Sequence, residues 1–303
     1  MSQAWQRQPE RGSTGALSII HWIGTRIGRR SARALLYPIS LYFLLTAGDV
    51  RRASRRYLRR ILRREPGWTS ILRHIHCFAS TILDRVFLLT GQFERFDIRV
   101  HNGAIILDQV ASGSGALLLS AHLGSFEVLR AMGITGRQLP VKVLMNVDHN
   151  SAMTRFTNAL NPQMVDSIIP IQGVGTLLAV KEALDQGFLV GVLGDRVVRN
   201  DRAIACAFLG RPAAFPVGPL MIASALGCRV ILAFSLYRGG NRYDIYFEPL
   251  ADSISTATGR SAKEIAPWLQ VYADRLAWHT RLSPYNWFNF FDFWADERRD
   301  ERT

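Results

Sequence analysis

A run of apolar residues that ends in a polar turn constrains the fold of this 303-residue chain more than any other feature. Residues 116–119 read Ala-Leu-Leu-Leu and lead through Ser-Ala to His122, a pattern typical of a strand that is buried on both faces. Gly124 and Ser125 then open a segment in which apolar residues recur at helical spacing. A buried strand that leads directly into a helix is typical of an open α/β sheet, and such sheets bind their ligands at the carboxyl ends of the strands. The sequence therefore predicts that His122 lies at a ligand-binding edge.

The rest of the chain supports an α/β fold. From residue 91 to residue 294, strand-like and helix-like segments alternate, which predicts one α/β sandwich domain with a mostly parallel sheet. The polar segments 1–15 and 295–303 are expected to be disordered and frayed, respectively. The predicted strands are 96–100, 116–122, 141–147, 168–171, 188–193, 229–236 and 243–247. Helices are predicted at 105–111 (a short one), from 126 onward, and at 151–160, 176–186, 216–226 and 262–282.

Residues 16–90 predict a helical region of a different character. The apolar run 34–47 has about fourteen residues, whereas a membrane-spanning helix needs roughly twenty. We expect this run to be an interfacial or re-entrant membrane segment, and a helix packed on the protein core is the alternative. Aromatic residues suited to the headgroup level of a bilayer are Trp22, Tyr37 and Tyr42.

Paired arginines follow this apolar run and recur every four residues. On a helix they would form a broad cationic face opposite an apolar one, as in proteins that bind anionic lipid surfaces. Nucleic-acid binding and a solvated face are alternatives, but the position directly after an apolar run favours lipid, and the positive-inside tendency favours the cytoplasmic side. The candidate membrane-binding residues are Arg51, Arg52, Arg55, Arg56, Arg59, Arg60, Arg63 and Arg64.

Charge and cysteine content restrict the partners and the compartment. The formal net charge of +13 predicts an anionic partner: phospholipid headgroups, nucleic acid or an acidic carrier protein. Cys77, Cys206 and Cys228 are dispersed in apolar segments, which argues against a disulfide framework or a zinc site and for a reducing compartment. Residues 1–15 lack the apolar core of a secretory signal peptide.

His122 and Glu127 are the candidate catalytic pair. Five positions apart they would not share a helix face, but across a strand-to-helix turn they can meet. A carboxylate on one imidazole nitrogen leaves the other nitrogen free to accept a proton. A structural histidine and a helix-capping glutamate are the alternative. Because the sequence offers no Gly-x-Ser-x-Gly elbow, we expect the attacking hydroxyl to belong to the substrate.

Further candidate site residues lie near the same edge. Asp195 and Arg196 follow the predicted strand 188–193 and should reach the ligand crevice, with a local ion pair as the alternative. Gly124 and Ser125 at the turn are candidate substrate-binding residues, as is Arg155. No metal is expected, because the His/Glu pair has no third or fourth ligand nearby.

Three blocks of the sequence resemble a known family. His122-Leu-Gly-Ser-Phe-Glu127 after a Leu-rich strand is similar to the His-x-x-x-x-Glu signature of the lysophospholipid acyltransferase superfamily, and most to its bacterial lipid A lauroyl and myristoyl transferases. Residues 191–196 resemble the family's strand that ends in an Asp-containing loop, and residues 208–219 resemble its Phe-Phe-Gly…Pro-x-Gly-Pro block. The likeness covers roughly residues 30–290, and the arginines of 51–64 stand where the family has its own Arg-rich helix.

The resemblance implies a membrane-associated acyltransferase of the glycerolipid acyltransferase-like α/β fold. It would use an acyl carrier protein or acyl-CoA thioester, need no further cofactor, and act on a hydroxyl of a lipid or glycolipid at the cytoplasmic face of the bacterial inner membrane. His122 would be the general base and Glu127 the residue that orients it. The chain departs from the family at Arg196, where glutamine is common, and in the tail from Trp287 to Trp294, which is aromatic and lacks basic residues, so the acceptor is either lipid A or another specialised lipid.

Two other functions are consistent with parts of this pattern. A lipid-processing hydrolase would use the same pair to activate water, and thioester turnover with and without a lipid acceptor would distinguish it. A non-enzymatic nucleic-acid binder would interleave aromatic and basic residues on one exposed face. Here the aromatic residues gather near the C-terminus and the arginines near the N-terminus, which disfavours nucleic acid as a partner.

Overall fold

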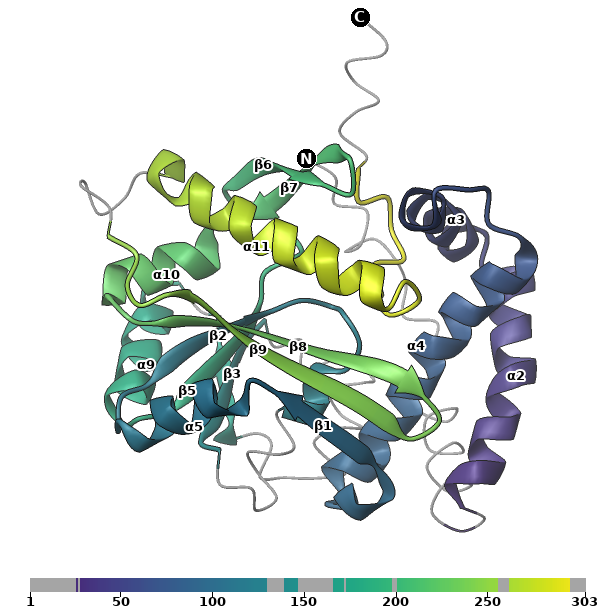
Figure 1. The fold of residues 1–303 in the computed structure, drawn as a ribbon, viewed down its shortest axis with the longest axis horizontal. Coiled ribbons are helices and arrows are strands. Elements are labelled where there is room, and N and C mark those ends of the chain that lie inside the picture. The colour runs from purple at the N-terminus through teal and green to yellow at the C-terminus, as the bar shows by residue number, and fades with distance from the viewer. Residues whose placement is uncertain are drawn as a thin grey trace, which may run out of the picture.

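The computed structural model describes residues 26, 28–129, 139–146, 166–171, 173–197, 201–255 and 262–294. This part of the chain is built on a sheet with the strand order β1-β9-β8-β2-β5-β3-β4 (Figure 1). The strands are β1 (Asp97–His101), β2 (Ala116–Ser120), β3 (Val141–Met145), β4 (Ile168–Pro170), β5 (Leu189–Leu193), β8 (Val230–Gly239) and β9 (Arg242–Ala251). The strands from β8 to β4 run parallel, whereas β9 and β1 run in the opposite direction. The predicted α/β fold with a mostly parallel sheet is therefore confirmed.

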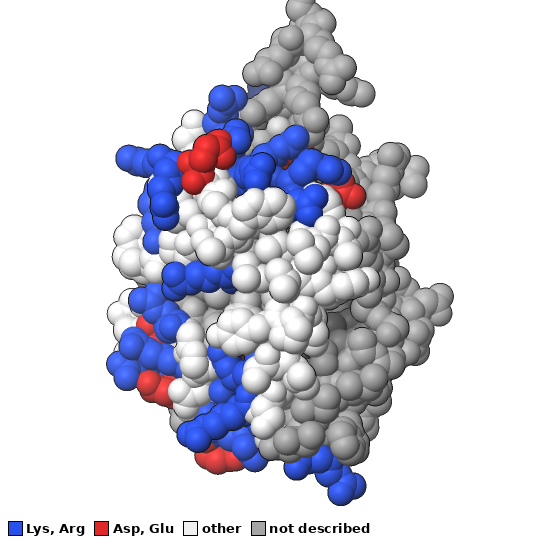
Figure 2. All heavy atoms as spheres, turned by 90° about the vertical axis from the view of Figure 1, so that its right-hand side faces the viewer, with Lys and Arg blue, Asp and Glu red and all other residues white. Residues whose placement is uncertain are grey.

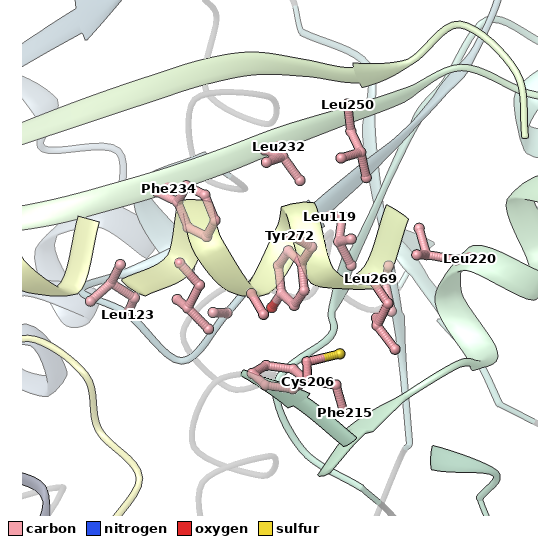
Figure 3. Close-up of a cluster of buried hydrophobic side chains, with 14 of the residues drawn as sticks. Leu119, Leu123, Cys206, Phe215, Leu220, Leu232, Phe234, Leu250, Leu269 and Tyr272 are labelled. Carbon is pink, nitrogen blue, oxygen red and sulfur yellow. The ribbon is translucent and has the colours of Figure 1, made fainter. Parts of the chain in front are cut away.

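Strand β2 lies in the middle of the sheet, and its side chains alternate between two cores. Leu117 and Leu119 belong to the core under helix α11 (Ala262–Leu282), where Leu119 lies near Tyr272 (Figure 3). Ala116 and Leu118 point into the core on the opposite face of the sheet. Because both faces are covered, a continuous apolar run is what this position in the sheet requires.

Three helices form a layer beside the sheet: α2 (Arg29–Thr46), α3 (Gly48–Leu62) and α4 (Trp68–Leu89) (Figure 1). Helix α4 contacts α2, α3 and β8. Arg29 of α2 donates two hydrogen bonds of 2.8 Å to the buried Asp84 of α4, which also accepts a hydrogen bond from Tyr243 of β9. This cluster ties the helical layer to the sheet. Among the residues described, no helix has the length and apolar content to cross a membrane.

The other helices cover both faces of the sheet. They are η1 (Phe93–Arg95), α5 (Gly103–Ala111), a helix that begins at 126, α9 (Val174–Asp185) and α10 (Gly218–Leu226). A small hairpin of β6 (Ala203–Phe208) and β7 (Arg211–Pro216) was not predicted from the sequence. The hairpin contacts α11, and the helix predicted from 216 begins two residues later because β7 extends to Pro216. The predicted helix 151–160 and the terminal segments 1–15 and 295–303 lie outside the described residues.

Candidate active site

The register of two parallel strands brings His122 and Asp195 together. Ser120 at the end of β2 pairs with Leu193 at the end of β5, so the chain leaves both strands at the same edge. The His122 Nδ1 atom lies 2.7 Å from Asp195 Oδ1. Gly194 precedes Asp195, and a Cβ there would come within 2.6 Å of Leu119 Cδ1, so a larger residue would require the Leu119 side chain to move.

The Asp195 carboxylate is fully buried and surrounded by donors. The backbone N–H of His122 lies 3.1 Å from both carboxylate oxygens, and Oδ2 also accepts 2.9 Å hydrogen bonds from Trp287 Nε1 and Asn289 Nδ2. Burial alone would raise the pKa of Asp195, but the charge and hydrogen bond of His122, the charge of Arg196 and the hydrogen bond from Asn289 outweigh it and lower the pKa to about 2. Asp195 is therefore ionised at neutral pH.

An ionised Asp195 fixes the proton on His122. A carboxylate can only accept, so Nδ1 must carry the hydrogen, and the lone pair of the neutral ring lies on Nε2. Burial of the ring and the positive charge of Arg196 lower the pKa of His122, against the opposing effect of Asp195. The side chain is still 28% exposed, so a substrate group can reach it. Such a histidine is suited to act as a general base.

Glu127 lies in the first turn of the helix that begins at 126, close to the site. Its Oε1 atom forms a 3.3 Å ion pair with Nη2 of Arg85 on α4. The sequence predicted this carboxylate as the partner that orients His122, whereas the carboxylate in contact with Nδ1 is that of Asp195. The positive charge of Arg85 is one of the effects that lower the pKa of His122. Glu127 thus contacts a cation of the site.

Gly124 and Ser125 form the turn between β2 and the following helix. Gly124 has a φ of +67°, and a Cβ at this position would overlap the carbonyl oxygen of Ser235 on β8. Its N–H donates to Asn286 O at 2.8 Å, and the N–H of Ser125 donates to Ser235 O at 3.0 Å. The two backbone amides therefore hold the turn against its neighbours.

Arg196 is held by the C-terminal segment. Its Nε donates to Asn289 Oδ1 at 2.7 Å and its Nη2 donates to Phe288 O at 3.0 Å. Burial lowers the pKa of this guanidinium to about 10, and the charge of Asp195 opposes that effect. Arg155, the other predicted substrate-binding arginine, lies outside the described residues.

The contribution of residues 286–289 to the site was missed by sequence reasoning. These residues read Asn-Trp-Phe-Asn, and two of them, Trp287 and Asn289, donate to Asp195. The sequence feature that could have indicated this role is the pair of asparagines in an otherwise aromatic run. Both asparagines are buried, and a buried amide needs hydrogen-bond partners. Among the described residues, no group of His, Cys, Asp and Glu side chains has an arrangement that could hold a metal ion.

The paired arginines are divided between solvent and the protein. Arg56 forms an ion pair with Asp292, and the Arg60 guanidinium lies 4.4 Å from the ring centroid of Trp294. Arg51 Nη1 donates to Leu44 O at 2.7 Å. The exposed members are Arg52, Arg55, Arg59, Arg63 and Arg64.

The site has the features of an enzyme that removes a proton from its substrate. These features are a partly exposed imidazole and a buried carboxylate that orients it, both at the carboxyl edge of an α/β sheet. The family described as bacterial lipid A biosynthesis acyltransferase matches residues 85–294, more than half of the chain. The chain therefore belongs to this family of lipid acyltransferases. No curated protein matches it.

Proposed function

We propose that this protein transfers a fatty acyl group from a thioester, carried by acyl carrier protein or coenzyme A, to a hydroxyl of lipid A or a related glycolipid or lipid. The observation that carries the proposal is the 2.7 Å contact between His122 Nδ1 and the buried Asp195. It leaves the Nε2 lone pair directed away from Asp195, on a side chain that is partly exposed.

The proposed reaction needs one base. Nε2 of His122 takes the proton of the acceptor hydroxyl while the hydroxyl oxygen attacks the thioester carbonyl. As the tetrahedral intermediate collapses, the C–S bond breaks and the same proton passes from Nε2 to the departing sulfur. The products are an ester and a free thiol, and His122 is neutral again. Asp195 stabilises the imidazolium that exists between the two proton transfers.

Positive charge beside His122 supports the developing oxyanion. The amides of Gly124 and Ser125 already donate to backbone carbonyls, so we assign this role to the guanidinium groups and not to those two amides. Arg85 and Arg196 both act electrostatically on His122, and a cation in a site of low dielectric stabilises negative charge more strongly than one in water.

We further propose that the helical layer binds the cytoplasmic surface of the bacterial inner membrane. Helix α2 packs through Leu36 and Leu44, while its other side exposes Leu41, Tyr42 and Leu45, which are 47%, 62% and 62% exposed. Figure 2 shows this side of the molecule as a wide uncharged area bordered by Lys and Arg side chains. An apolar area with a cationic border fits a bilayer of anionic lipid, where both the hydrophobic and the electrostatic attraction act.

Vesicle partitioning tests this membrane role. Arg55, Arg63 and Arg64 are the arginines to change, because Arg56 and Arg60 contact Asp292 and Trp294, and Arg52 and Arg59 form ion pairs with Asp49 and Glu65. Changing these three to Gln should weaken binding to phosphatidylglycerol vesicles about 100-fold, at about 1 kcal/mol per charge near the surface. The control removes three charges from exposed residues on other elements, Arg99, Lys263 and Arg281. Equal partitioning of the two triple variants would refute a specific cationic border.

The acidic acyl carrier protein is the proposed donor partner, since the net charge of +13 would speed its association in a salt-dependent way.

Mass spectrometry tests the reaction. Wild-type protein with lauroyl-carrier protein or lauroyl-CoA and a hydroxyacylated lipid A precursor should yield a lipid heavier by one acyl group and an equal amount of free thiol. Release of thiol at the same rate with and without the lipid, and with no new ester, would instead identify a hydrolase.

A further inference from the structure

The C-terminal segment from Asn286 to Asn289 lies directly against the turn from His122 to Ser125, called here the catalytic turn. The N–H of Phe288 donates to His122 O at 2.8 Å, and Asn286 O accepts from the N–H of Gly124 at the same distance. Leu123 and Trp287 form an antiparallel bridge between the two segments. The Asn286 side chain accepts a 2.6 Å hydrogen bond from the N–H of Tyr237 at the end of β8. These bonds fix the segment at the carboxyl edge of the sheet.

Two side chains of this segment act on one oxygen of Asp195. Trp287 Nε1 and Asn289 Nδ2 each donate to Oδ2 at 2.9 Å, while His122 Nδ1 lies on Oδ1 at 2.7 Å. The carboxylate therefore has one oxygen for the C-terminal segment and one for the imidazole. Rotation of the carboxyl group would break at least one of these bonds.

We propose that Trp287 and Asn289 are positioning residues of the active site, which hold Oδ2 of Asp195 so that Oδ1 orients His122 and which limit the pull of the carboxylate on the imidazole proton. The inference rests on the proposed role of His122 as a base, and it assigns the C-terminal segment a function in that chemistry.

The two donors to Asp195 also affect the charge of the imidazole. Each donor to Asp195 stabilises its negative charge and so weakens its attraction for a proton on His122. The other charged groups that act on the imidazole are Arg196, which follows Asp195, and Arg85 of α4, which is paired with Glu127. Both arginines disfavour the imidazolium. A base must be neutral at the working pH, and the two donors help to keep it so.

The helical layer supports the segment from behind. The buried His74 of α4 lies 2.9 Å from Trp287 O through Nε2 and 2.8 Å from Ser54 Oγ of α3 through Nδ1. Because a carbonyl oxygen only accepts, Nε2 carries the proton and the Ser54 hydroxyl donates to Nδ1. Tyr57 of α3 donates to Pro284 O at 2.7 Å. The position of the Trp287 indole is thus set by α3 and α4 as well as by its own segment.

A titration of the imidazole tests the proposal without any substrate. The full-length protein is labelled with ¹⁵N-histidine, and the His122 signals are identified among the seven histidines by their loss in His122→Gln. Trp287→Phe removes the indole donor and keeps an aromatic ring, and Asn289→Leu removes the amide. Trp294→Phe is the matched control, because Trp294 is also buried in the same aromatic tail and its Nε1 has no hydrogen-bond partner among the described residues.

Trp287→Phe and Asn289→Leu should each raise the pKa of His122 by about 0.5 to 1. Each change removes a hydrogen bond to the Asp195 carboxylate, which then attracts the proton of the His122 imidazolium more strongly. Trp294→Phe should titrate like the wild type. In the pH dependence of activity, the fall in rate on the acid side should move to higher pH by the same amount. A His122 pKa that stays at the wild-type value or falls in both variants, with only a lower melting temperature, would overturn the proposal and make the segment merely structural.

The titration also separates this inference from the proposed function. If the protein shows no acyl transfer but the two variants raise the pKa of His122, the positioning role stands and the reaction assignment fails. If acyl transfer is found and the imidazole titration is unchanged, the positioning role fails by itself. Should Trp287→Phe not fold, Asn289→Leu gives the same test through the second donor.

Discussion

Replacing Asp195 by asparagine is the most informative single change, because it keeps the shape of the side chain and removes its charge. The Oδ2 position accepts from Trp287 Nε1 and Asn289 Nδ2, so the amide oxygen of the new side chain should occupy it. The new NH₂ group then faces His122 Nδ1. Because both of its hydrogens are donors, Nδ1 must become an acceptor and the imidazole proton moves to Nε2, the atom that the proposed reaction needs to be free.

The magnitude follows from two effects. Loss of a working general base should lower kcat by about 10²–10⁴-fold. The pKa of Asp195 falls from an ordinary value of 3.8 to about 2 on folding. At 1.36 kcal/mol per unit, this difference contributes about 2–3 kcal/mol of stability. Because the folded pKa is the lower one, that contribution is present above pH 4 and is lost as the pH falls towards 2. Asp195→Asn should lack it at pH 7.

The assay combines acyl transfer with urea unfolding at pH 7. Asp244→Asn is the control, since Asp244 is another buried carboxylate, paired with Arg238 and Arg242 on the sheet. We expect the control to lose stability and to keep kcat within a few fold. A folded Asp195→Asn protein with near-normal kcat would refute the reasoning, because the wrong tautomer of His122 cannot accept the proton.

Three further changes test other parts of the site. Glu127→Gln and Arg85→Gln should lower kcat by similar factors and the double variant no further, measured as a double-mutant cycle, because the two side chains form one ion pair. Gly124→Ala should destabilise the fold by on the order of 4 kcal/mol or more, because Gly124 has a positive φ and no room for a Cβ. Gly175→Ala is the control: a Cβ there meets open space, so its melting temperature should not fall. His74→Leu should lower the free energy of unfolding by about 1–3 kcal/mol for each hydrogen-bond partner left buried and unsatisfied, read by urea denaturation.

The sequence predicted where the polar residues of the site lie but not how they pair. His122 and Asp195 each follow a buried apolar run, which is enough to place both at the carboxyl edge of a parallel sheet. Their contact depends on β2 and β5 being neighbours, and strand order is not contained in the periodicity of either run. Glu127 was the obvious partner because it is five residues away, whereas Asp195 is 73 residues away.

The elements that were missed share a physical reason. The hairpin strand β7 contains Pro212 and Pro216, and proline removes a donor and weakens any strand pattern, so the run was not recognised. Residues 286–289 have no helical or strand period, since they are held by individual hydrogen bonds to the catalytic turn and not by regular structure. Both depend on contacts between distant parts of the chain.

His122 is proposed as the base in acyl transfer, and the kcat of His122→Gln tests this role most directly. His76→Gln is the matched control, since His76 is half-buried on α4, where its Nδ1 lies 3.5 Å from Ser40 Oγ. With far-UV circular dichroism unchanged in both variants, His122→Gln should transfer acyl groups about 10²–10⁴-fold more slowly than the wild type, while the control keeps its rate. A folded His122→Gln protein that forms the ester at close to the wild-type rate would contradict the account.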